Sequence, residues 1–464
     1  MNSTSLQTIA QWVNGQLHLG SNTENNVNIN QVSTDTRKIV AGDLFIALKG
    51  ENFDAHTFVE QGKADVAAAV IVEHHCDVAC SQIIVEDSRL ALGDLARAYR
   101  QHFTGKVFGI TGSNGKTTVK EMIAAICKIK GETLATIGNL NNDIGLPQTL
   151  FNVQQHAYAV IEMGANHHGE ISYLTNIAKP DIAVITHAGS AHLEGFGDIP
   201  GVAKAKGEIY EGLGENGIAV INADDPHNAV WFDKASSHKV LTFGLHNKAD
   251  FSADWKAGDT GNQIDLISCI EGNTETTQIS MNLFGVHNVM NALAAAAASS
   301  AAGIDLMTIK QGLEKMQSVK GRLQWNLGPQ GMRVLDDTYN ANPTSLSAGL
   351  AVLATVPGEH WLILGDMGEL GNKSEEMHEE AGRLARRAGV SRMLTFGVLS
   401  RFASEFFGEG GEHFTDQQAL LNTVNSEWKG EGAVLVKGSR SMQMEQFVDA
   451  LKQQAVEQAA EEEY

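Results

Sequence analysis

One short segment constrains the fold of this chain more than any other. Residues 109–118 read GITGSNGKTT, a glycine-rich loop that ends in a lysine and two threonines. The apolar run KVFGI, residues 106–110, leads into it. After it, four apolar residues recur at helical spacing: Val119, Met122, Ile123 and Ile126. A strand, a glycine-rich loop and a helix in this order are typical of a parallel α/β sheet.

The loop has the composition of a phosphate-binding site, although its spacing departs from the common P-loop by one residue. The pattern G-x-x-x-x-G-K-[ST] requires glycine where Ile110 stands. Backbone N–H groups at Ser113, Asn114 and Gly115 can still surround phosphate oxygens, helped by the dipole of the following helix. Lys116 would neutralise the β and γ phosphates, and Thr117 would ligate Mg²⁺. The alternative is a glycine-rich turn with a solvated lysine.

Length and composition restrict the number of domains and the kinds of molecule that we expect this chain to bind. The 464 residues are too many for one compact core, which predicts two or three domains. Lys and Arg number 34 against 55 Asp and Glu, a formal net charge of −21. A field of that sign repels nucleic acid and anionic lipid, so we expect neither as a principal partner.

The N-terminal residues lack the basic start and apolar core of a secretory signal, and no run of about 18 apolar residues predicts a membrane span. We therefore expect a cytoplasmic protein without membrane insertion. Four cysteines are too few for a disulfide framework. The segment HHCDVAC, around Cys76 and Cys80, fits no common zinc spacing, so we interpret these cysteines as structural.

The chain divides into three regions. Residues 1–86 mix short strand-like runs with turns, and SRLALGDLARAYRQHF predicts a connecting helix. Residues 87–318 alternate strands and helices, except for three short antiparallel strands expected within 250–285. Residues 319–464 begin a second α/β run. We expect a doubly wound parallel sheet in each of the two larger regions.

Polar residues follow several of the expected strands, where open parallel sheets bind ligands. Glu162 closes the strand YAVIE, in the position of a carboxylate that would hold a metal near the nucleotide. His192 follows the strand DIAVIT. Lys206 lies on an expected helix, and its sequence context alone favours a solvated side chain. In the last region, the segments DDTYNANPTS, LGDMGELG and VLVKGSRS also end strands, which indicates a binding face.

These motifs together resemble the Mur ligases, the ATP-dependent enzymes that build the cell-wall peptide. The resemblance rests on TGSNGKTT, STDTRKIVAGDLFIALKGENFDAH, GNLNNDIGLP, AHLEGFG, VAKAKGEIY, DDTYNANPTS, LGDMGELG and VKGSRSMQME, from about Ser33 to Glu445. The loop of that family lacks the first glycine, which accounts for Ile110. The N-terminal motif and GDMGELG narrow the resemblance to the branch that adds D-Ala-D-Ala to a UDP-N-acetylmuramoyl-tripeptide.

The resemblance implies an α/β protein of three domains. A small N-terminal α/β domain (1–86) would bind the UDP end of the substrate. A central P-loop-type parallel-sheet ATPase domain (87–318) would bind ATP, and a C-terminal Rossmann-like domain (319–464) would bind the dipeptide. ATP and Mg²⁺ are the implied cofactors. We expect a large domain movement that excludes water from an acyl phosphate, and a monomer suits such a movement.

The resemblance also assigns residues to the site. Catalytic roles fall to Lys116, Glu162, His192 and Lys206. Thr117, Glu162, His192 and Lys206 match the metal ligands, with Lys206 carbamylated, which overturns the solvated interpretation of that lysine. Nucleotide-binding positions are Thr111, Gly112, Ser113, Asn114, Gly115, Lys116, Thr117, Thr118, His287, Asn288, Asn291, Arg322 and Asp337. Substrate positions are Ser33, Thr34, Asp35, Arg37, Lys49, Asn52, Asp54, Asn139, Asn141, Asn142, Asp366, Glu369, Lys437 and Arg440.

Two rival functions stay open at this stage. The chain could be another ligase of the same family that adds a single amino acid, or an enzyme similar to folylpolyglutamate synthase. It could also be a P-loop switch or an ATP-driven binding module without ligase chemistry, although that leaves the two flanking α/β regions unexplained. The third residue of the tripeptide, diaminopimelate or lysine, is not determined by the sequence.

Overall fold

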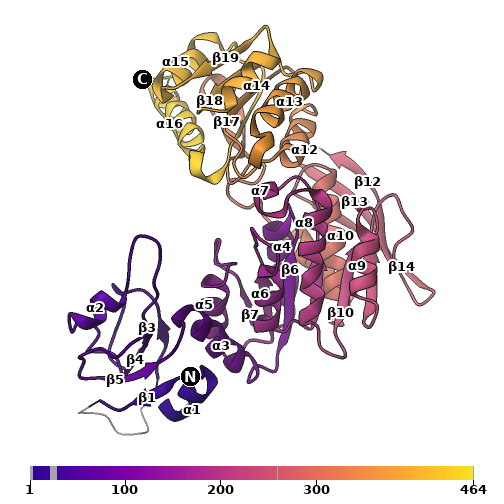
Figure 1. Ribbon diagram of the computed structural model, residues 1–464. Coiled ribbons are helices and arrows are strands. Elements are labelled where there is room, and N and C mark those ends of the chain that lie inside the picture. The colour runs from indigo at the N-terminus through magenta and orange to yellow at the C-terminus, as the bar shows by residue number, and fades with distance from the viewer. Residues whose placement is uncertain (1–3, 21–28, 259, 463–464) are drawn as a thin grey trace.

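The computed structural model describes residues 4–20, 29–258 and 260–462, which form three lobes in chain order (Figure 1). Each lobe contains one β-sheet, of five, nine and six strands in turn. The α/β class and the three-part architecture expected from the sequence are confirmed. Within the described ranges, no helix is both long and apolar enough to cross a membrane.

The N-terminal lobe is built on a small mixed sheet with the strand order β1-β5-β4-β3-β2. Strand β1 pairs antiparallel with β5, and the other neighbours are parallel. Its elements are α1 (Leu6–Trp12), β1 (Gln16–His18), β2 (Val32–Ser33), β3 (Leu44–Ile46), α2 (His56–Glu60), β4 (Ala69–Val72) and β5 (Ser81–Ile84). Helix α3 (Ser88–Arg100), capped by the Asp87 side chain, leads out of this lobe and packs on the second one.

The central lobe holds the largest sheet, in the order β14-β13-β12-β11-β10-β9-β6-β8-β7. Its strands are β6 (Lys106–Thr111), β7 (Thr133–Ala135), β8 (Tyr158–Glu162), β9 (Ile182–Ile185), β10 (Ile218–Asn222), β11 (Lys239–Phe243), β12 (Phe251–Gly258), β13 (Gly261–Ile270) and β14 (Asn273–Met281). Strands β6 to β11 run parallel to their neighbours. The antiparallel strands expected within 250–285 are confirmed as β12–β14, which extend the same sheet.

Helices cover both faces of this central sheet because its parallel strands are apolar on both sides. Along β6, Phe108 and Ile110 face a core with α4 and α10, whereas Val107 faces a core with α6 and α8. The helices of this lobe are α4 (Lys116–Lys130), α5 (Gly145–Phe151), α6 (Glu170–Ala178), α7 (Leu193–Phe196), α8 (Ile199–Gly207), α9 (Asn228–Lys234), α10 (Val286–Ala301) and α11 (Leu306–Glu314).

The C-terminal lobe is a second doubly wound unit, with the strand order β15-β16-β20-β17-β18-β19. All of its neighbours are parallel except β15 and β16. Its elements are β15 (Gln324–Leu327), β16 (Arg333–Asp337), α12 (Pro343–Leu353), β17 (Glu359–Gly365), α13 (Ser374–Arg387), β18 (Arg392–Phe396), α14 (Ser400–Phe407), β19 (Gly411–Phe414), α15 (Gln417–Glu427), β20 (Gly432–Lys437) and α16 (Glu445–Glu462).

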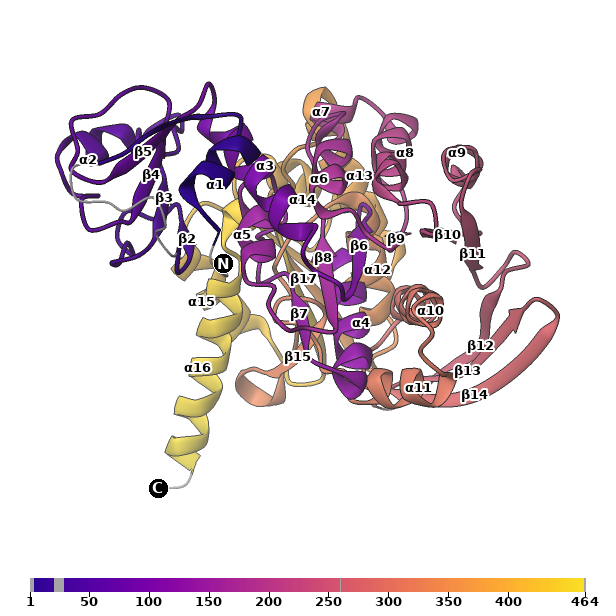
Figure 2. The ribbon, with the colours of Figure 1, turned by 90° about the horizontal axis from the view of Figure 1, so that it is seen from below.

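The second view shows the three lobes from another side, with α16 projecting from the C-terminal lobe (Figure 2). The central and C-terminal sheets both direct the carboxyl ends of strands toward the space between their lobes. Strands β6 and β8 end there at Thr111 and Glu162, and strands β16 and β20 end there at Asp337 and Lys437. The fold therefore brings polar residues from two sheets to one place.

Candidate active site between two sheets

The glycine-rich loop joins β6 to α4, and two of its glycines have backbone geometry that other residues rarely adopt. Gly112 has φ +145° and Gly115 has φ +81°. A Cβ at Gly112 would lie 1.9 Å from Thr186 Oγ1, and one at Gly115 would lie 2.4 Å from Asn291 Oδ1. The loop is therefore a tight backbone turn at the helix start, which leaves its N–H groups available to an anion.

Lys116, the first residue of α4, folds back over this loop. Its Nζ donates to the carbonyl oxygens of Gly112 at 2.7 Å and Ser113 at 3.3 Å. Burial lowers the pKa of Lys116, and the nearby Glu162 opposes that effect. The ammonium group thus lies where its charge would stabilise a bound phosphate most.

Glu162 and Thr117 carry the oxygen atoms expected to hold a metal. Glu162 Oε1 accepts a hydrogen bond from Asn141 Nδ2 at 2.8 Å, while Oε2 is buried and has no partner among the described residues. Thr117 Oγ1 accepts from the Arg322 guanidinium at 3.2 Å. An orphaned carboxylate oxygen beside a phosphate loop is the donor that Mg²⁺ prefers, so these residues fit that ion.

His192 connects the central lobe to the C-terminal one. Its Nδ1 lies 2.6 Å from Glu369 Oε2, and the Glu369 carbonyl also accepts the Glu194 N–H at 3.3 Å. The His192 ring holds the pKa of Glu369 below its ordinary value. His192 itself has φ +55°. This contact places a predicted metal ligand and a predicted substrate residue against each other.

Lys206 lies on α8 and is fully buried. Its Nζ is 3.5 Å from the Ala165 carbonyl and 5.2 Å from the centre of the Phe196 ring. Burial, followed by the charge of Lys116, lowers the pKa of Lys206 to about 7. The structure thus excludes the solvated side chain that local sequence context favoured. A neutral amine, the form that reacts with CO₂, is accessible near neutral pH.

The C-terminal wall of the site contains a buried ion pair. Lys437, at the end of β20, pairs with Asp337, at the end of β16, and also donates to the Asn340 carbonyl at 2.8 Å. Arg322 stacks over the Tyr339 ring at 4.2 Å. These contacts fix the loop after β16 against the neighbouring strand.

Three residues near the start of α10 form the wall opposite this loop. Asn291 donates to the Asn288 side chain at 3.1 Å. Burial lowers the pKa of His287 to about 4, and its Nε2 has no partner in the part of the chain that the structure describes. A neutral imidazole and two amides suit a polar, uncharged ligand group such as a base or ribose.

One cavity of about 1000 Å³ unites most of the predicted residues. Eighteen of them line it: Ser113, Asn114, Gly115, Lys116, Thr118, Asn139, Asn141, Asn142, Glu162, His192, His287, Asn288, Asn291, Arg322, Asp337, Glu369, Lys437 and Arg440. Four other predicted residues of the central lobe do not line it: Thr111, Gly112, Thr117 and Lys206. The cavity is large enough for a nucleotide and part of a second ligand.

The predicted residues of the N-terminal lobe do not line this cavity. Ser33, Thr34 and Asp35 line a second cavity of about 1040 Å³, where Gln148 Nε2 donates to Thr34 Oγ1 at 2.6 Å. Asp35 forms a two-bond pair with Arg37. Their assignment to a uridine diphosphate site stays a prediction.

A separate loop of the same lobe carries Lys49, Asn52 and Asp54. Lys49 and Asp54 bridge across it, and Asp54 Oδ1 accepts from the His56 ring at 2.7 Å. Asn52 is exposed. Their predicted role beside the uridine diphosphate is likewise untested.

Asp366 also lies outside both cavities. Its carboxylate accepts backbone N–H groups of Val398, Leu399 and Ser400, at 2.7–3.1 Å. These bonds hold the start of α14. A contact between Asp366 and the dipeptide stays a prediction, and the observed bonding gives this residue a structural role.

Several cavity residues were not predicted. Arg89 and Asp143 form an ion pair at its edge, and His168, Glu170 and Tyr339 also line it. Arg89 is in the first turn of a helix that starts outside the central sheet, so strand-end patterns gave no signal for it. Tyr339 follows β16 directly and could have been found from its position.

The two cysteines of the segment HHCDVAC pack into the N-terminal core. Cys76 is buried there, and burial raises the pKa of its thiol. Its sulfur lies within 4.8 Å of ligand atoms of Glu60 and His74, which bond to each other at 3.1 Å and are half exposed. The thiol keeps its proton in this setting, in agreement with the structural role expected from the sequence.

The fold and the cavity define a nucleotide-binding α/β enzyme whose site lies between two sheets. Comparison with known proteins identifies the family. The Mur ligase middle domain matches residues 110–299, and the Mur ligase, glutamate ligase domain matches residues 321–440. The chain belongs to the Mur ligase family.

Individual relatives match over nearly the whole length. The UDP-N-acetylmuramoyl-tripeptide–D-alanyl-D-alanine ligase of Escherichia coli K12 is 44% identical over 98% of this chain and 99% of its own length. A crystal structure of MurF from Acinetobacter baumannii has a TM-score of 0.90 and 36% identity, covering 98% of this chain and 100% of that one. A MurF ligase from Thermotoga maritima in complex with ADP has a TM-score of 0.82 and 29% identity, covering 92% and 98%.

The loop geometry yields a prediction for Gly112→Ala. The new Cβ would collide with Thr186 Oγ1, and alanine would be strained at φ +145°. Backbone strain of about 1–3 kcal/mol predicts a loss of nucleotide affinity of about tenfold or more. Isothermal titration calorimetry with ATP measures it. Gly214→Ala, where a Cβ meets nothing within 4 Å, is the matched control. Equal affinity of the Gly112 variant and the wild type would contradict the role of the loop.

Proposed function

We propose that this chain joins D-Ala-D-Ala to the terminal carboxyl group of a UDP-N-acetylmuramoyl-tripeptide, with cleavage of ATP to ADP and phosphate, in peptidoglycan precursor synthesis. The observation that carries this function is the single cavity that phosphate-binding Lys116 shares with Lys437 and Arg440 of the C-terminal lobe. The full-length relatives with this named activity supply the identity of the substrates. They also favour this reaction over the addition of a single amino acid.

The chemical problem is amide formation in water. A carboxylate is a poor electrophile, so it must first be activated. The peptide carboxylate attacks the γ-phosphorus of ATP, and the bond to the β-phosphate oxygen breaks, which gives an acyl phosphate and ADP. The uncharged amine of the dipeptide then attacks the acyl carbon, phosphate departs, and the amine loses a proton.

The first step brings two anions together, and the cations of the cavity make that possible. Two like charges 4 Å apart repel by about 1 kcal/mol in water and by about 4 kcal/mol in a partly desolvated site. Lys116 neutralises the phosphates from the loop. Arg322 reaches the same place from the C-terminal lobe, since its guanidinium contacts Thr117. Both cations are held in position before the substrates arrive.

Magnesium is part of the proposal. Thr117, Glu162, His192 and modified Lys206 would hold it, and the unpartnered Glu162 Oε2 is the atom that supports this assignment. When bound, the ion supplies charge neutralisation of the phosphates. Closure of the lobes around the cavity would keep water from the acyl phosphate.

We also propose that Lys206 is carbamylated. Its ammonium form would be a buried cation that, among the described residues, donates a hydrogen bond to a carbonyl and to no anion. An unpaired buried charge is costly. A carbamate removes that cation and supplies an anionic metal ligand. The lowered pKa reported above supports the modification, because the neutral amine is the reacting form.

The N-terminal lobe would hold the uridine diphosphate through Ser33, Thr34, Asp35 and Arg37. Because these residues lie outside the active-site cavity, the substrate must span two lobes, and a movement of the N-terminal lobe would close the site. We propose a monomer, since a single chain suits an enzyme that must open and close. Use of ATP and a UDP-linked substrate favours the cytoplasm.

An acceptor assay tests the proposed function. The purified chain is incubated with ATP, Mg²⁺ and UDP-N-acetylmuramoyl-tripeptide, and ADP release is followed with D-Ala-D-Ala or with single amino acids. We expect release that depends on D-Ala-D-Ala and matches the amide formed one to one. Running both the diaminopimelate and the lysine tripeptide identifies the third residue. Faster turnover with a single amino acid or glutamate would overturn the proposal.

Lys206→Ala tests the carbamate. We expect activity to fall by about 100-fold or more, as for the loss of a group that stabilises transition-state charge, and a short carboxylic acid should partly restore it. Lys204→Ala, an exposed lysine on the same helix, should retain wild-type activity. Labelling with ¹³C-bicarbonate should give a carbamate signal in the wild type that the Lys206 variant lacks. Full activity of Lys206→Ala without rescue would refute the role.

A further inference from the structure

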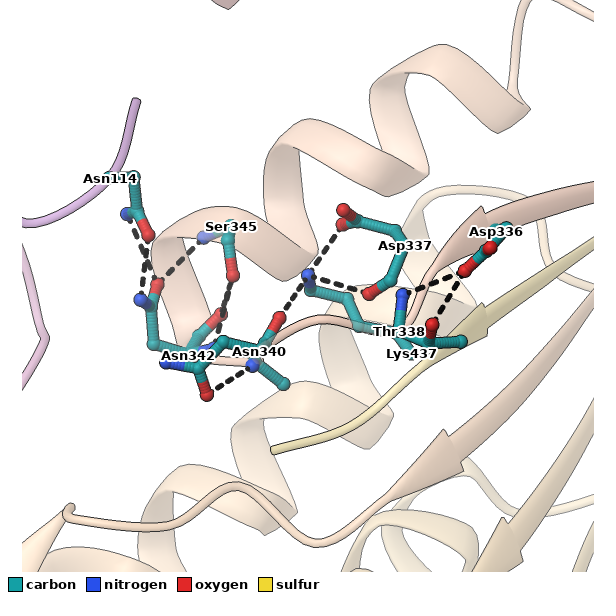
Figure 3. A network of polar contacts seen from close by, with 9 residues as sticks. Asn114, Asp336, Asp337, Thr338, Asn340, Asn342, Ser345 and Lys437 are labelled. Atoms are coloured by element: carbon teal, nitrogen blue, oxygen red, sulfur yellow. Dashed lines mark hydrogen bonds and ion pairs between the residues drawn. The ribbon is translucent and has the colours of Figure 1, made fainter. Parts of the chain in front are cut away.

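A pair of side-chain amides joins the phosphate loop to the C-terminal lobe, in addition to the contact of Arg322 with Thr117. Asn342 Nδ2 donates to Asn114 Oδ1 at 2.8 Å, and Asn114 Nδ2 donates to Asn342 Oδ1 at 3.3 Å (Figure 3). The two residues are 228 positions apart in the chain. Asn114 lies at the turn of the phosphate loop, so this amide bridge connects the nucleotide-binding backbone to the other lobe.

The Asn342 side of the amide bridge, in the C-terminal lobe, is rigidly held. Asn342 is buried and is the N-cap of α12: its Oδ1 accepts the Ser345 N–H at 2.8 Å, and its own N–H donates to Ser345 Oγ at 3.0 Å. This capping box fixes the side chain as well as the backbone. Asn342 therefore presents its amide in one orientation.

The Asn114 side of the amide bridge is equally constrained. The Asn114 carbonyl accepts a hydrogen bond from Thr186 Oγ1 at 2.6 Å, which ties the loop to the end of β9. Gly115, the next residue, has the left-handed geometry described above. Asn114 therefore projects from a fixed turn, and the two amides meet without any long flexible side chain.

The amide bridge belongs to the same segment as the buried ion pair. Residues 337–342 begin at Asp337, which pairs with Lys437, pass Asn340, whose carbonyl also binds Lys437, and end at Asn342 (Figure 3). This segment lines the cavity through Asp337, Tyr339 and Asn340. The C-terminal sheet holds the Asp337 end of this segment, and the phosphate loop contacts its Asn342 end.

A second contact between the two lobes pairs the His192 ring with the Glu369 carboxylate. The amide bridge is neutral, so neither salt nor the charge state of a ligand weakens it directly. Two short side chains that each donate and accept also require a defined distance and angle. The amide bridge is thus a neutral and directional contact that can fix register between the lobes.

We propose that Asn342 is a positioning residue for the ligation: through its amide pair with Asn114, it sets the C-terminal lobe on the phosphate loop so that the acceptor amine meets the activated carboxyl group. The proposal rests on the proposed function. Asn342 contacts the loop and no reacting atom, so it acts on the acceptor step through the placement of Lys437 and Arg440. Nucleotide binding depends on the loop backbone and Lys116, which Asn342→Ser leaves in place.

Asn342→Ser is the test variant, because serine keeps an oxygen that caps α12 but cannot form the paired amide. We expect kcat/KM for D-Ala-D-Ala to fall about 10- to 100-fold, the range expected for two lost hydrogen bonds. The affinity for ATP should stay within about twofold by titration calorimetry. Asp416→Ser, another N-cap exchange in the same lobe, caps α15 far from the cavity and should leave kcat/KM unchanged.

A double-mutant cycle with Asn114→Ala isolates the pair. If the two amides act as one unit, the double variant loses no more activity than the weaker single variant. Multiplying losses would show that each residue acts alone, which overturns the proposal. Unchanged kcat/KM in Asn342→Ser, with an active wild type, overturns it as well.

A distance measurement separates this proposal from the proposed function. Spin labels at Ser237→Cys and Glu405→Cys, both exposed, in a Cys269→Ser background report the separation of the two lobes in the full chain. With ATP bound, we expect a narrow distance distribution that broadens in Asn342→Ser. An identical distribution in both proteins contradicts the positioning role. If the distribution broadens in Asn342→Ser as expected but the wild type ligates no acceptor, the proposed function and the catalytic consequence of the amide bridge are contradicted.

Discussion

Buried positive charge is the constraint on which the rest of the site depends. Lys206 and Lys437 lie inside a protein with a net charge of −21, and Lys116 folds over a loop of backbone amides. A buried cation is stable only with an anion or in neutral form. Lys437 has Asp337 as its partner, whereas Lys206 and Lys116 bond to carbonyls. In the proposed function, the phosphates of ATP and a carbamate on Lys206 would supply the missing negative charge.

The position of this charge explains why two sheets are needed. One parallel sheet supplies the phosphate loop and Glu162 at its strand ends, and the other supplies Asp337 and Lys437. In the proposed function, the nucleotide and the acceptor would bind to different lobes, and the reaction would require those lobes to meet in one register. Asn114 and Asn342 form a neutral contact at that meeting point. The proposed chemistry is thus a property of the interface between two rigid sheets.

Local sequence predicted the features that depend on local chemistry. The strand, loop and helix around Lys116 and the antiparallel strands β12–β14 are confirmed, because periodicity and glycine placement encode them. Local context predicted a solvated Lys206 side chain, which was wrong, because the groups that surround it, Phe196 and Ala165, lie on other elements. Only the family resemblance indicated a different role for this lysine. The amide pair of Asn114 and Asn342 was not predicted, because nothing in either segment specifies a partner 228 residues away. Likewise, Asp366 shows a strand-end pattern but binds backbone amides.

The central claim is that a peptide carboxylate, and neither water nor a hydroxyl group, accepts the γ-phosphate. Isotope transfer tests it most directly. A tripeptide substrate carrying ¹⁸O in its terminal carboxylate is turned over with ATP and D-Ala-D-Ala, and the released phosphate is analysed by mass spectrometry. The attacking carboxylate oxygen leaves with the phosphate, so we expect one ¹⁸O atom in each phosphate formed. Phosphate that carries only solvent or ATP oxygen would contradict it.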